Sequence, residues 1–232
     1  MKFKRVTLLS GHYGSGKTGI AVAMAKELKK EYDKVAIADL DIVNPYFRTK
    51  DSEIELEQAG IKLICSKYAN SNVDLPALPD EMYSIIDEPE QRVIIDVGGD
   101  DRGALALGRL VPALIEENDF DMYMVINMYR PLTRTAEDTY GILKEIETAC
   151  GLHFTGLINN SNLGRYTQPE DVLASVEYAK AVAKLTGLPL TATTVEEGLY
   201  DVLKGKVEEL YPIGIRNKIF EYYKEGSDQW QS

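Results

Sequence analysis

One stretch near the N-terminus has the residue types and the spacing of a phosphate-binding loop. An apolar run over residues 6–9 precedes it, and a helix-compatible segment follows it. Glycines let the backbone turn tightly and come close to an anion, so that successive N–H groups converge on the phosphates. A glycine-rich turn could match the pattern by accident, but the flanking strand and helix favour a nucleotide site. The stretch is Gly11-His12-Tyr13-Gly14-Ser15-Gly16-Lys17-Thr18.

Two side chains in this loop can act directly on a bound nucleotide. Lys17 supplies a mobile charge for the β- and γ-phosphates, and the hydroxyl of Thr18 can bind Mg²⁺. We expect the helix to begin at about Gly16, which adds its unpaired amides and its positive dipole end to the site. Lys17 is also a candidate catalytic residue. The residues expected to contact the nucleotide are Gly11, His12, Tyr13, Gly14, Ser15, Gly16, Lys17, Thr18 and Gly19.

Carboxylates follow two later apolar segments. Residues 34–38 are predicted to form a buried strand that ends at Asp39 and Asp41, and residues 92–95 form another that ends at Asp96. Ligands of open α/β sheets bind at the carboxyl ends of the strands. We therefore predict that Asp39, Asp41 and Asp96 belong to a magnesium site with Thr18. Of Asp39 and Asp41, one is expected to hold a magnesium-bound water and the other to orient the attacking water. Ordinary turn chemistry is the alternative explanation for Asp39 and Asp41.

The sequence after Asp96 contains Gly98 and Gly99, which would let backbone amides approach a γ-phosphate and act as a switch. A later strand, residues 154–158, ends at Asn159. An amide both donates and accepts hydrogen bonds, so Asn159 is a candidate for contacting a purine base, an asparagine-rich turn being the alternative. Arg130 and Arg134 follow a further strand and either meet phosphate or an anionic partner, or are solvated surface residues.

The composition limits the classes of function. The chain has 232 residues with 26 basic and 37 acidic side chains, a net charge of −11 that argues against a nucleic-acid surface. Cys65 and Cys150 belong to no metal-binding pattern, so we expect two buried thiols. The N-terminal apolar run is too short for a signal peptide, and no stretch approaches the length of a membrane span. We expect a cytoplasmic protein with no membrane attachment.

Apolar strands alternate with helical segments along the chain, which predicts an α/β fold: a doubly wound, mostly parallel sheet with helices on both faces. We expect one nucleotide-binding domain over residues 1–232, with residues 225–232 as a flexible polar tail. Three further elements are a helix over 105–115 that Pro112 kinks or shortens, a last strand over 188–193, and an amphipathic helix over 207–224.

The glycine loop, Ala38-Asp39-Leu40-Asp41, Ile95-Asp96-Val97-Gly98-Gly99 and Ile158-Asn159-Asn160 occur in that order. Together they resemble the MinD/ParA/CobQ/CobB nucleotide-binding family of P-loop proteins, within the SIMIBI class, which includes the nitrogenase iron protein and nickel-insertion ATPases. The resemblance implies ATP and Mg²⁺ as ligands, Asp41 as the switch residue that activates water, Asp96 as the residue of the magnesium shell and Asn159 as the adenine contact.

One position departs from the pattern. Many members carry lysine as the second loop residue and use it across an ATP-sandwiched dimer, whereas this chain has His12. The resemblance therefore implies ATP binding but not hydrolysis that depends on a partner's lysine. Three functions compete: a switch ATPase that acts on a protein partner or a metallocofactor, with a nucleotide-dependent homodimer as one form; an ATP-dependent small-molecule kinase or ligase; and a nucleotide-binding scaffold without turnover.

Overall fold

The structure is a computed structural model, and it describes residues 3–40, 53–65, 82, 88–99 and 101–214. Several sequence predictions lie outside these residues: Asp41 and its switch, the helix predicted beyond residue 214, and the tail at 225–232. The remaining predictions can be compared with the structure.

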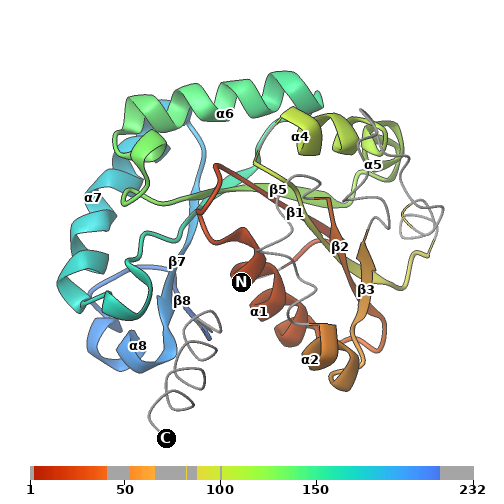
Figure 1. Cartoon of the computed structure of the whole chain (residues 1–232), viewed down its shortest axis with the longest axis horizontal. Helices are drawn as coiled ribbons and strands as arrows, with labels where there is room; N and C mark the ends of the chain where they lie inside the picture. The colour runs from red at the N-terminus through yellow and green to blue at the C-terminus, as the bar shows by residue number, and fades with distance from the viewer. Residues whose placement is uncertain (1–2, 41–52, 66–81, 83–87, 100, 215–232) are drawn as a thin grey trace, which may run out of the picture.

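In the described part of the chain, eight strands form one sheet in the order β3-β2-β4-β1-β5-β6-β7-β8, and the seven pairings between them are all parallel (Figure 1). The predicted α/β fold with a mostly parallel sheet is confirmed. β1 is central because its two neighbours, β4 and β5, lead to opposite halves of the sheet. The strands are β1 (Val6–Ser10), β2 (Val35–Asp39), β3 (Lys62–Cys65), β4 (Arg92–Asp96), β5 (Phe120–Ile126), β6 (Gly156–Asn159), β7 (Leu190–Glu196) and β8 (Leu210–Ile213).

Helices cover both faces of this sheet (Figure 1). They are α1 (Lys17–Lys29), α2 (Glu53–Gln58), α4 (Asp101–Gly108), α5 (Val111–Glu117), α6 (Ala136–Cys150), α7 (Pro169–Thr186) and α8 (Glu197–Leu203), with 3₁₀ turns η3 (Pro131–Thr133) and η4 (Gly164–Tyr166). Successive strand residues point to opposite faces, so Leu8 packs with α4 and α6 while Leu9 packs with α1. This double burial explains why the strands are almost continuously apolar.

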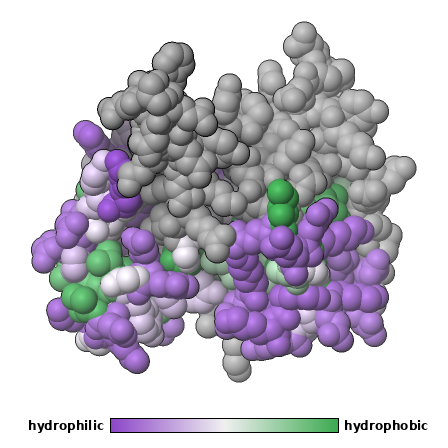
Figure 2. Space-filling model, turned by 60° about the horizontal axis from the view of Figure 1, so that its bottom comes forward, coloured by the Kyte–Doolittle hydropathy of each residue, from purple (hydrophilic) through white to green (hydrophobic). Residues whose placement is uncertain are grey.

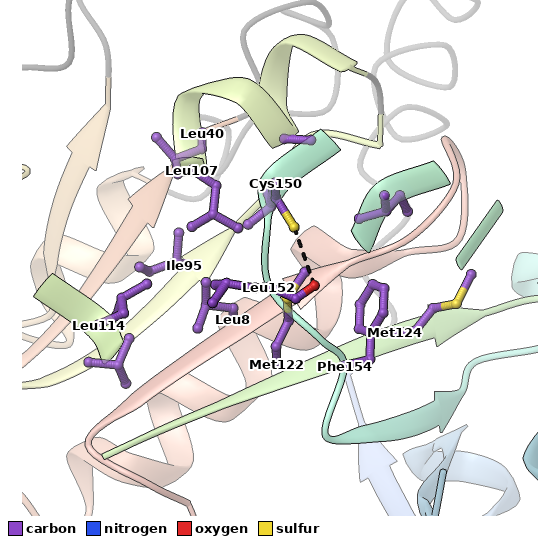
Figure 3. Close-up of a cluster of buried hydrophobic side chains, with 14 of the residues drawn as sticks. Leu8, Leu40, Ile95, Leu107, Leu114, Met122, Met124, Cys150, Leu152 and Phe154 are labelled. Atoms are coloured by element: carbon purple, nitrogen blue, oxygen red, sulfur yellow. Dashed lines mark hydrogen bonds between the residues drawn. The ribbon is translucent and has the colours of Figure 1, made fainter. Parts of the chain in front are cut away.

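The core on the α4 and α6 face contains Leu8, Ile95, Met122 and Phe154 (Figure 3). Cys150 belongs to this core as a free, buried thiol, as predicted, and burial raises its pKa. Its Sγ–H donates to the Leu152 carbonyl at 3.8 Å. The side chain of Cys65 is outside the described part. The α6 end of the core is therefore fixed by packing.

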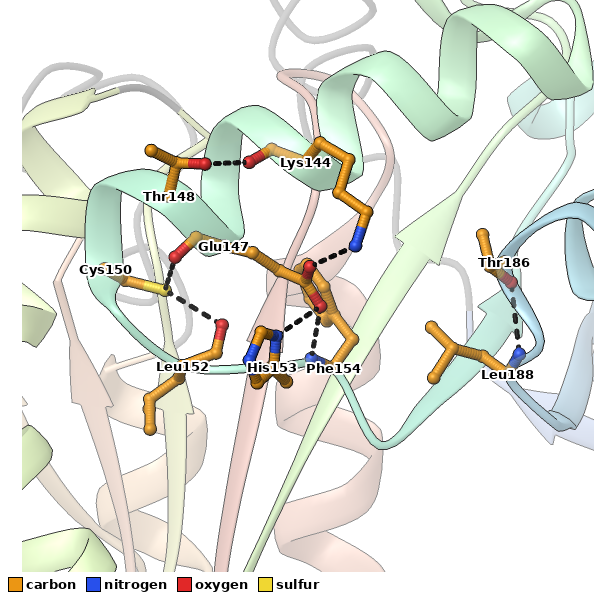
Figure 4. Close-up of polar contacts among 9 residues, drawn as sticks. All are labelled: Lys144, Glu147, Thr148, Cys150, Leu152, His153, Phe154, Thr186 and Leu188. Carbon is orange, nitrogen blue, oxygen red and sulfur yellow. Dashed lines mark hydrogen bonds and ion pairs between the residues drawn. The ribbon is translucent and has the colours of Figure 1, made fainter.

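A polar cluster lies where α6 ends (Figure 4). The Glu147 carboxylate, 8% exposed, accepts hydrogen bonds from Lys144 Nζ at 2.8 Å and the Phe154 N–H at 3.1 Å, and lies 3.3 Å from His153 Nδ1. Burial alone would raise the pKa of Glu147, but these bonds outweigh it, and the pKa is lowered. The cluster connects α6 to the segment that enters β6.

Two predicted elements were wrong in extent. The helix predicted over 105–115 is two helices, because α4 ends at Gly108 and α5 begins anew at Val111 with Pro112 in its first turn. The strand predicted over 188–193 is β7, which continues to Glu196.

The helix predicted from Val207 onward was also wrong within its first turns, because Leu210–Ile213 form the edge strand β8. Pro212 suits an edge strand because its missing N–H breaks no ladder bond there. The described part of the chain contains no helix with both the length and the apolar character needed to cross a membrane. Among the residues that Figure 2 colours, most of the drawn surface is hydrophilic, with separate small apolar patches.

Candidate functional site

The loop between β1 and α1 turns tightly at the carboxyl edge of the sheet. Gly14 and Gly16 have φ of 77° and 92°, left-handed values that side chains with a Cβ rarely adopt. The Ser15 N–H points across the turn to the His12 carbonyl at 3.1 Å. Gly16 is the N-cap residue of α1, so the first amides of this helix, which have no acceptor within an α-helix, lie beside the same loop. The arrangement fits an anion.

Lys17 is buried, with 6% exposure, and its amine lies within this loop. Nζ donates to the Gly11 carbonyl at 2.8 Å and lies 3.5 Å from the His12 carbonyl. Phosphate oxygens are stronger acceptors for an ammonium group than neutral carbonyls are. A phosphate bound in the loop could therefore replace these carbonyls as the hydrogen-bond acceptor of the Lys17 amine.

Thr18 and Asp96 meet beside the start of α1. The Thr18 hydroxyl donates to Asp96 Oδ2 at 2.5 Å, and Asp96 is buried, with 1% of its surface exposed. Asp39 is the register partner of Asp96 on the neighbouring strand and is 5% exposed. Hydroxyl and carboxylate oxygens are the ligands that Mg²⁺ prefers, so these three residues fit a magnesium ion.

Gly99, after β4, packs directly on the glycine loop. A Cβ at Gly99 would lie 2.4 Å from the Gly11 carbonyl oxygen and 2.9 Å from the Tyr13 nitrogen. The main chain can approach the loop this closely only without a side chain. The structure thus brings together the two glycine segments that the sequence singled out.

The other predicted loop residues have different surroundings. His12 is half-buried with Nδ1 3.0 Å from the Tyr13 carbonyl, and Tyr13 is 50% exposed. The Ser15 Oγ is buried, with no hydrogen-bond partner in the described part of the chain. Gly19 is exposed in the first turn of α1. His12, Tyr13 and Gly19 are therefore partly or fully open to solvent, whereas Ser15 is buried.

Asn159 is the last residue of β6, the place that the sequence predicts, but its side chain lies inside the protein. Its side chain is fully buried, Nδ2 donates to Ser175 Oγ at 2.9 Å, and Oδ1 accepts from the N–H and the hydroxyl of Ser161 at 3.2 and 2.7 Å. These bonds join β6 to α7. This burial argues against the predicted contact between Asn159 and a base, because the amide is not open to a ligand.

The next residue, Asn160, faces the glycine loop instead, which the sequence analysis missed. Its Nδ2 donates to the Ser15 carbonyl at 2.6 Å, and its Oδ1 accepts from the Thr194 hydroxyl at 2.5 Å. A Cβ on Gly16 would lie 2.2 Å from that Nδ2. The paired asparagines were a signal, but only the register of the strand end decides which of them points to the loop.

Arg130 is a second neighbour of the loop, for which the sequence left two explanations open. Its Nε donates to the Gly14 carbonyl at 2.8 Å. The carbonyls of Gly14 and Ser15, adjacent in the loop, are thus each held by a side chain from a different strand end. The loop is supported from outside by β5 and β6.

Comparisons with known proteins agree with this architecture. The solved structure of FtsY from Thermotoga maritima has a TM-score of 0.59 at 20% identity, covering 83% of this chain and 62% of that one. Chloroplast FtsY from Physcomitrella patens has a TM-score of 0.59 at 19% identity, covering 87% and 61%. The signal recognition particle 54 kDa protein from Aeropyrum pernix, solved with GDP, has a TM-score of 0.51 at 16% identity, covering 83% and 41%.

At these identities the likeness shows the fold, and this chain spans about three fifths of the length of the FtsY chains. No curated protein matches the sequence. A family model does: the CobQ/CobB/MinD/ParA nucleotide binding domain matches residues 6–187, which include β1, the glycine loop, Asp96 and the paired asparagines. This chain therefore belongs to the CobQ/CobB/MinD/ParA nucleotide-binding domain family.

Proposed function

We propose that this protein binds MgATP, hydrolyses it slowly and works as a nucleotide-dependent switch that positions or activates a protein partner or a metallocofactor. The observation that carries the proposal is the hydrogen bond between Thr18 and Asp96 at the start of α1, directly after the glycine loop. Phosphoryl transfer needs a phosphate cradle and a magnesium site within reach of each other. One edge of this sheet supplies residues for both.

Each residue has a defined part in this proposal. The amides of Gly11 to Thr18 bind the phosphates, and Lys17 exchanges its carbonyl partners for phosphate oxygens. Thr18, Asp39 and Asp96 hold the magnesium ion, which when bound neutralises charge that develops on the phosphates. Asp41 orients the attacking water, a role that rests on the sequence because Asp41 is outside the described residues.

The switch part of the proposal concerns Gly98 and Gly99. Gly99 lies against the loop backbone, so a γ-phosphate that enters the loop changes the surroundings of this segment. A protein partner or a second copy of this chain would respond to that change. His12 stands where many members of the family have lysine, so turnover in this proposal does not depend on a lysine from a partner.

The choice of ATP over GTP rests on the sequence. The chain has no Asn/Thr-Lys-x-Asp motif of the kind that binds guanine. The Aeropyrum pernix structure, in contrast, was solved with GDP. GTP is therefore the proper competitor in any binding assay.

Equilibrium binding tests the proposal. ATP with Mg²⁺ should bind the full chain, GTP should compete poorly, and Lys17→Ala should remove tight binding because the loop loses its charged donor. Unaltered affinity in Lys17→Ala would refute the assignment of the loop.

Turnover needs a separate assay. Phosphate release by the purified protein, reduced by Asp41→Asn, separates a slow ATPase from a scaffold that only binds. A phosphorylated product that forms only after a metabolite is added would replace the switch with a kinase or ligase.

A further inference from the structure

The turn that follows β5 is held firmly in place. Its first residue, Asn127, is 1% exposed, and Asn127 Oδ1 accepts from the Tyr129 N–H at 3.0 Å. The Asn127 carbonyl accepts from the Arg130 N–H at 3.2 Å and from the Thr133 hydroxyl at 2.7 Å. Residues 127–133 thus form a compact, hydrogen-bonded turn at the carboxyl end of the strand.

Two bonds from outside fix this turn to its neighbours. Ser161 Oγ accepts from the Met128 N–H at 3.0 Å, which joins the turn to the end of β6. The Tyr129 hydroxyl donates to the Asp171 carbonyl on α7 at 2.9 Å, and burial raises the pKa of this tyrosine. Hydrogen bonds from the turn after β5, from the end of β6 and from α7 therefore fix the backbone around Arg130, independently of its side chain.

From this position the Arg130 side chain extends to the middle of the glycine loop. Nε donates to the Gly14 carbonyl at 2.8 Å, and a Cβ on Gly14 would lie 3.3 Å from Nε and 3.6 Å from Cδ. The two Nη groups have no hydrogen-bond partner among the residues that the structure describes. The guanidinium thus packs against Gly14, and its Nη donors are not used by any described residue.

The hydrogen bond that fixes the Gly14 carbonyl also fixes the direction of the Ser15 N–H, because both groups belong to the same planar peptide. In a trans peptide the C=O and the N–H point in opposite directions, so a Gly14 carbonyl held outward turns the Ser15 N–H inward. The Ser15 N–H does point across the turn, to the His12 carbonyl at 3.1 Å. Asn160 acts on the following peptide through the Ser15 carbonyl, which turns the Gly16 N–H the same way.

We propose that Arg130 is a positioning residue of the phosphate site: through its hydrogen bond to the Gly14 carbonyl it presets the loop amides for an anion. This inference rests on the proposed function, because it assumes that the loop binds phosphates. An arginine suits the role because a charged donor makes a stronger bond to a carbonyl than a neutral one, and its charge persists at all physiological pH values.

The test uses the full chain with three variants: Arg130→Ala, Arg130→Lys and the control Arg92→Gln. Arg92 begins β4 at the opposite edge of the sheet, where it lies over the Tyr32 ring. The ligands are MgATP, pyrophosphate and adenosine. We expect Arg130→Ala to weaken both phosphate-bearing ligands by about tenfold to a hundredfold, as for loss of a charged hydrogen bond, and to leave adenosine unchanged.

Arg130→Lys distinguishes a role in positioning the loop amides from a role in the stability of the fold alone. Lysine keeps one charged donor for the Gly14 carbonyl, so it should recover most of the affinity for pyrophosphate. Urea unfolding without ligand should give similar midpoints for Arg130→Lys and the wild type, so that the comparison is made on folded protein even if Arg130→Ala is poorly stable.

The outcomes separate the two proposals. If the wild type binds MgATP, Lys17→Ala does not, and Arg130→Ala binds pyrophosphate as tightly as the wild type, this inference is wrong and the proposed function stands. Equal losses in Arg130→Ala and Arg92→Gln would overturn it as well. If the wild type binds no phosphate-bearing ligand, the proposed function itself fails.

Discussion

The hydroxyl of Thr18 lies 2.5 Å from Oδ2 of Asp96, although 78 residues separate the two in the chain. Parallel pairing explains the contact. Leu9 and Asp96 are register partners on β1 and β4, so the loop that leaves β1 begins beside the carboxylate that ends β4. The pairing of β1 with β4 thus brings together two oxygen groups that neither segment contains alone.

Replacing Thr18 should remove the magnesium dependence of nucleotide binding. Thr18→Ala deletes one of the paired oxygens, so the affinity for ATP in the presence of Mg²⁺ should fall by roughly tenfold to a hundredfold, while affinity in EDTA stays close to that of the wild type. Calorimetric titration with and without Mg²⁺ measures both. Thr18→Ser keeps the hydroxyl and serves as the control. If Thr18→Ser loses as much affinity for MgATP as Thr18→Ala, the missing hydroxyl does not explain the loss.

A side chain at Gly99 should disturb the glycine loop. The Cβ of Gly99→Ala would lie 2.4 Å from the Gly11 carbonyl oxygen, so the main chain must move, at a cost of about 1–3 kcal/mol in the free energy of unfolding. Nucleotide affinity should fall as well. Gly141→Ala is the matched control, because nothing lies within 4 Å of its Cβ in α6, and it should stabilise the protein by about 0.5–1 kcal/mol. Urea unfolding that ranks the two variants the other way would contradict this packing.

Asn160 and Thr194 should be energetically coupled. Asn160→Ala leaves the Ser15 carbonyl and the Thr194 hydroxyl without this partner in a buried position, which should lower the free energy of unfolding by about 1–3 kcal/mol. Thr194→Val removes the bond to Asn160 Oδ1 together with a longer one from the same hydroxyl to the Asn159 carbonyl at 3.3 Å. A double-mutant cycle should give a coupling of about 0.5–3 kcal/mol, and strict additivity of the two changes would speak against the link.

The Glu147 cluster should contribute to stability in a pH-dependent way. The pKa of Glu147 in the folded protein lies below its ordinary value of 4.5, so the carboxylate stabilises the fold above that pH. The contribution is lost as the pH falls from 4.5 through the lower pKa of the folded state. Glu147→Gln should therefore cost stability at pH 7 and cost progressively less below pH 4.5, as measured by urea unfolding at several pH values. A cost that does not change with pH would show that the charge is not responsible.

The sequence predicted the fold and the glycine loop because both depend on local patterns. Continuous apolar strands, glycines at fixed spacing and an aspartate at the end of β4 are visible one segment at a time. The structure confirmed the parallel sheet and brought Lys17, Thr18, Asp39, Asp96 and Gly99 to one edge.

What the sequence missed depends on single-residue register and on long-range contacts. Whether Asn159 or Asn160 faces the loop changes with one residue of register in β6, and no local pattern determines it. The contact between Arg130 and Gly14 joins residues 116 positions apart. β8 was mistaken for a helix because apolar residues beyond it follow a helical period, which outweighed the strand-compatible Pro212 at the edge.

The central claim is that the loop from Gly11 to Thr18 holds a triphosphate whose magnesium is bound by Thr18 and Asp96. A crystal structure of the protein with Mg²⁺ and a non-hydrolysable ATP analogue tests it most directly. We predict that the phosphates accept hydrogen bonds from the loop amides and Lys17, and that the Thr18 hydroxyl has turned from Asp96 to the metal. A nucleotide bound elsewhere, with Thr18 still donating to Asp96 and Lys17 still on the Gly11 carbonyl, would contradict the account.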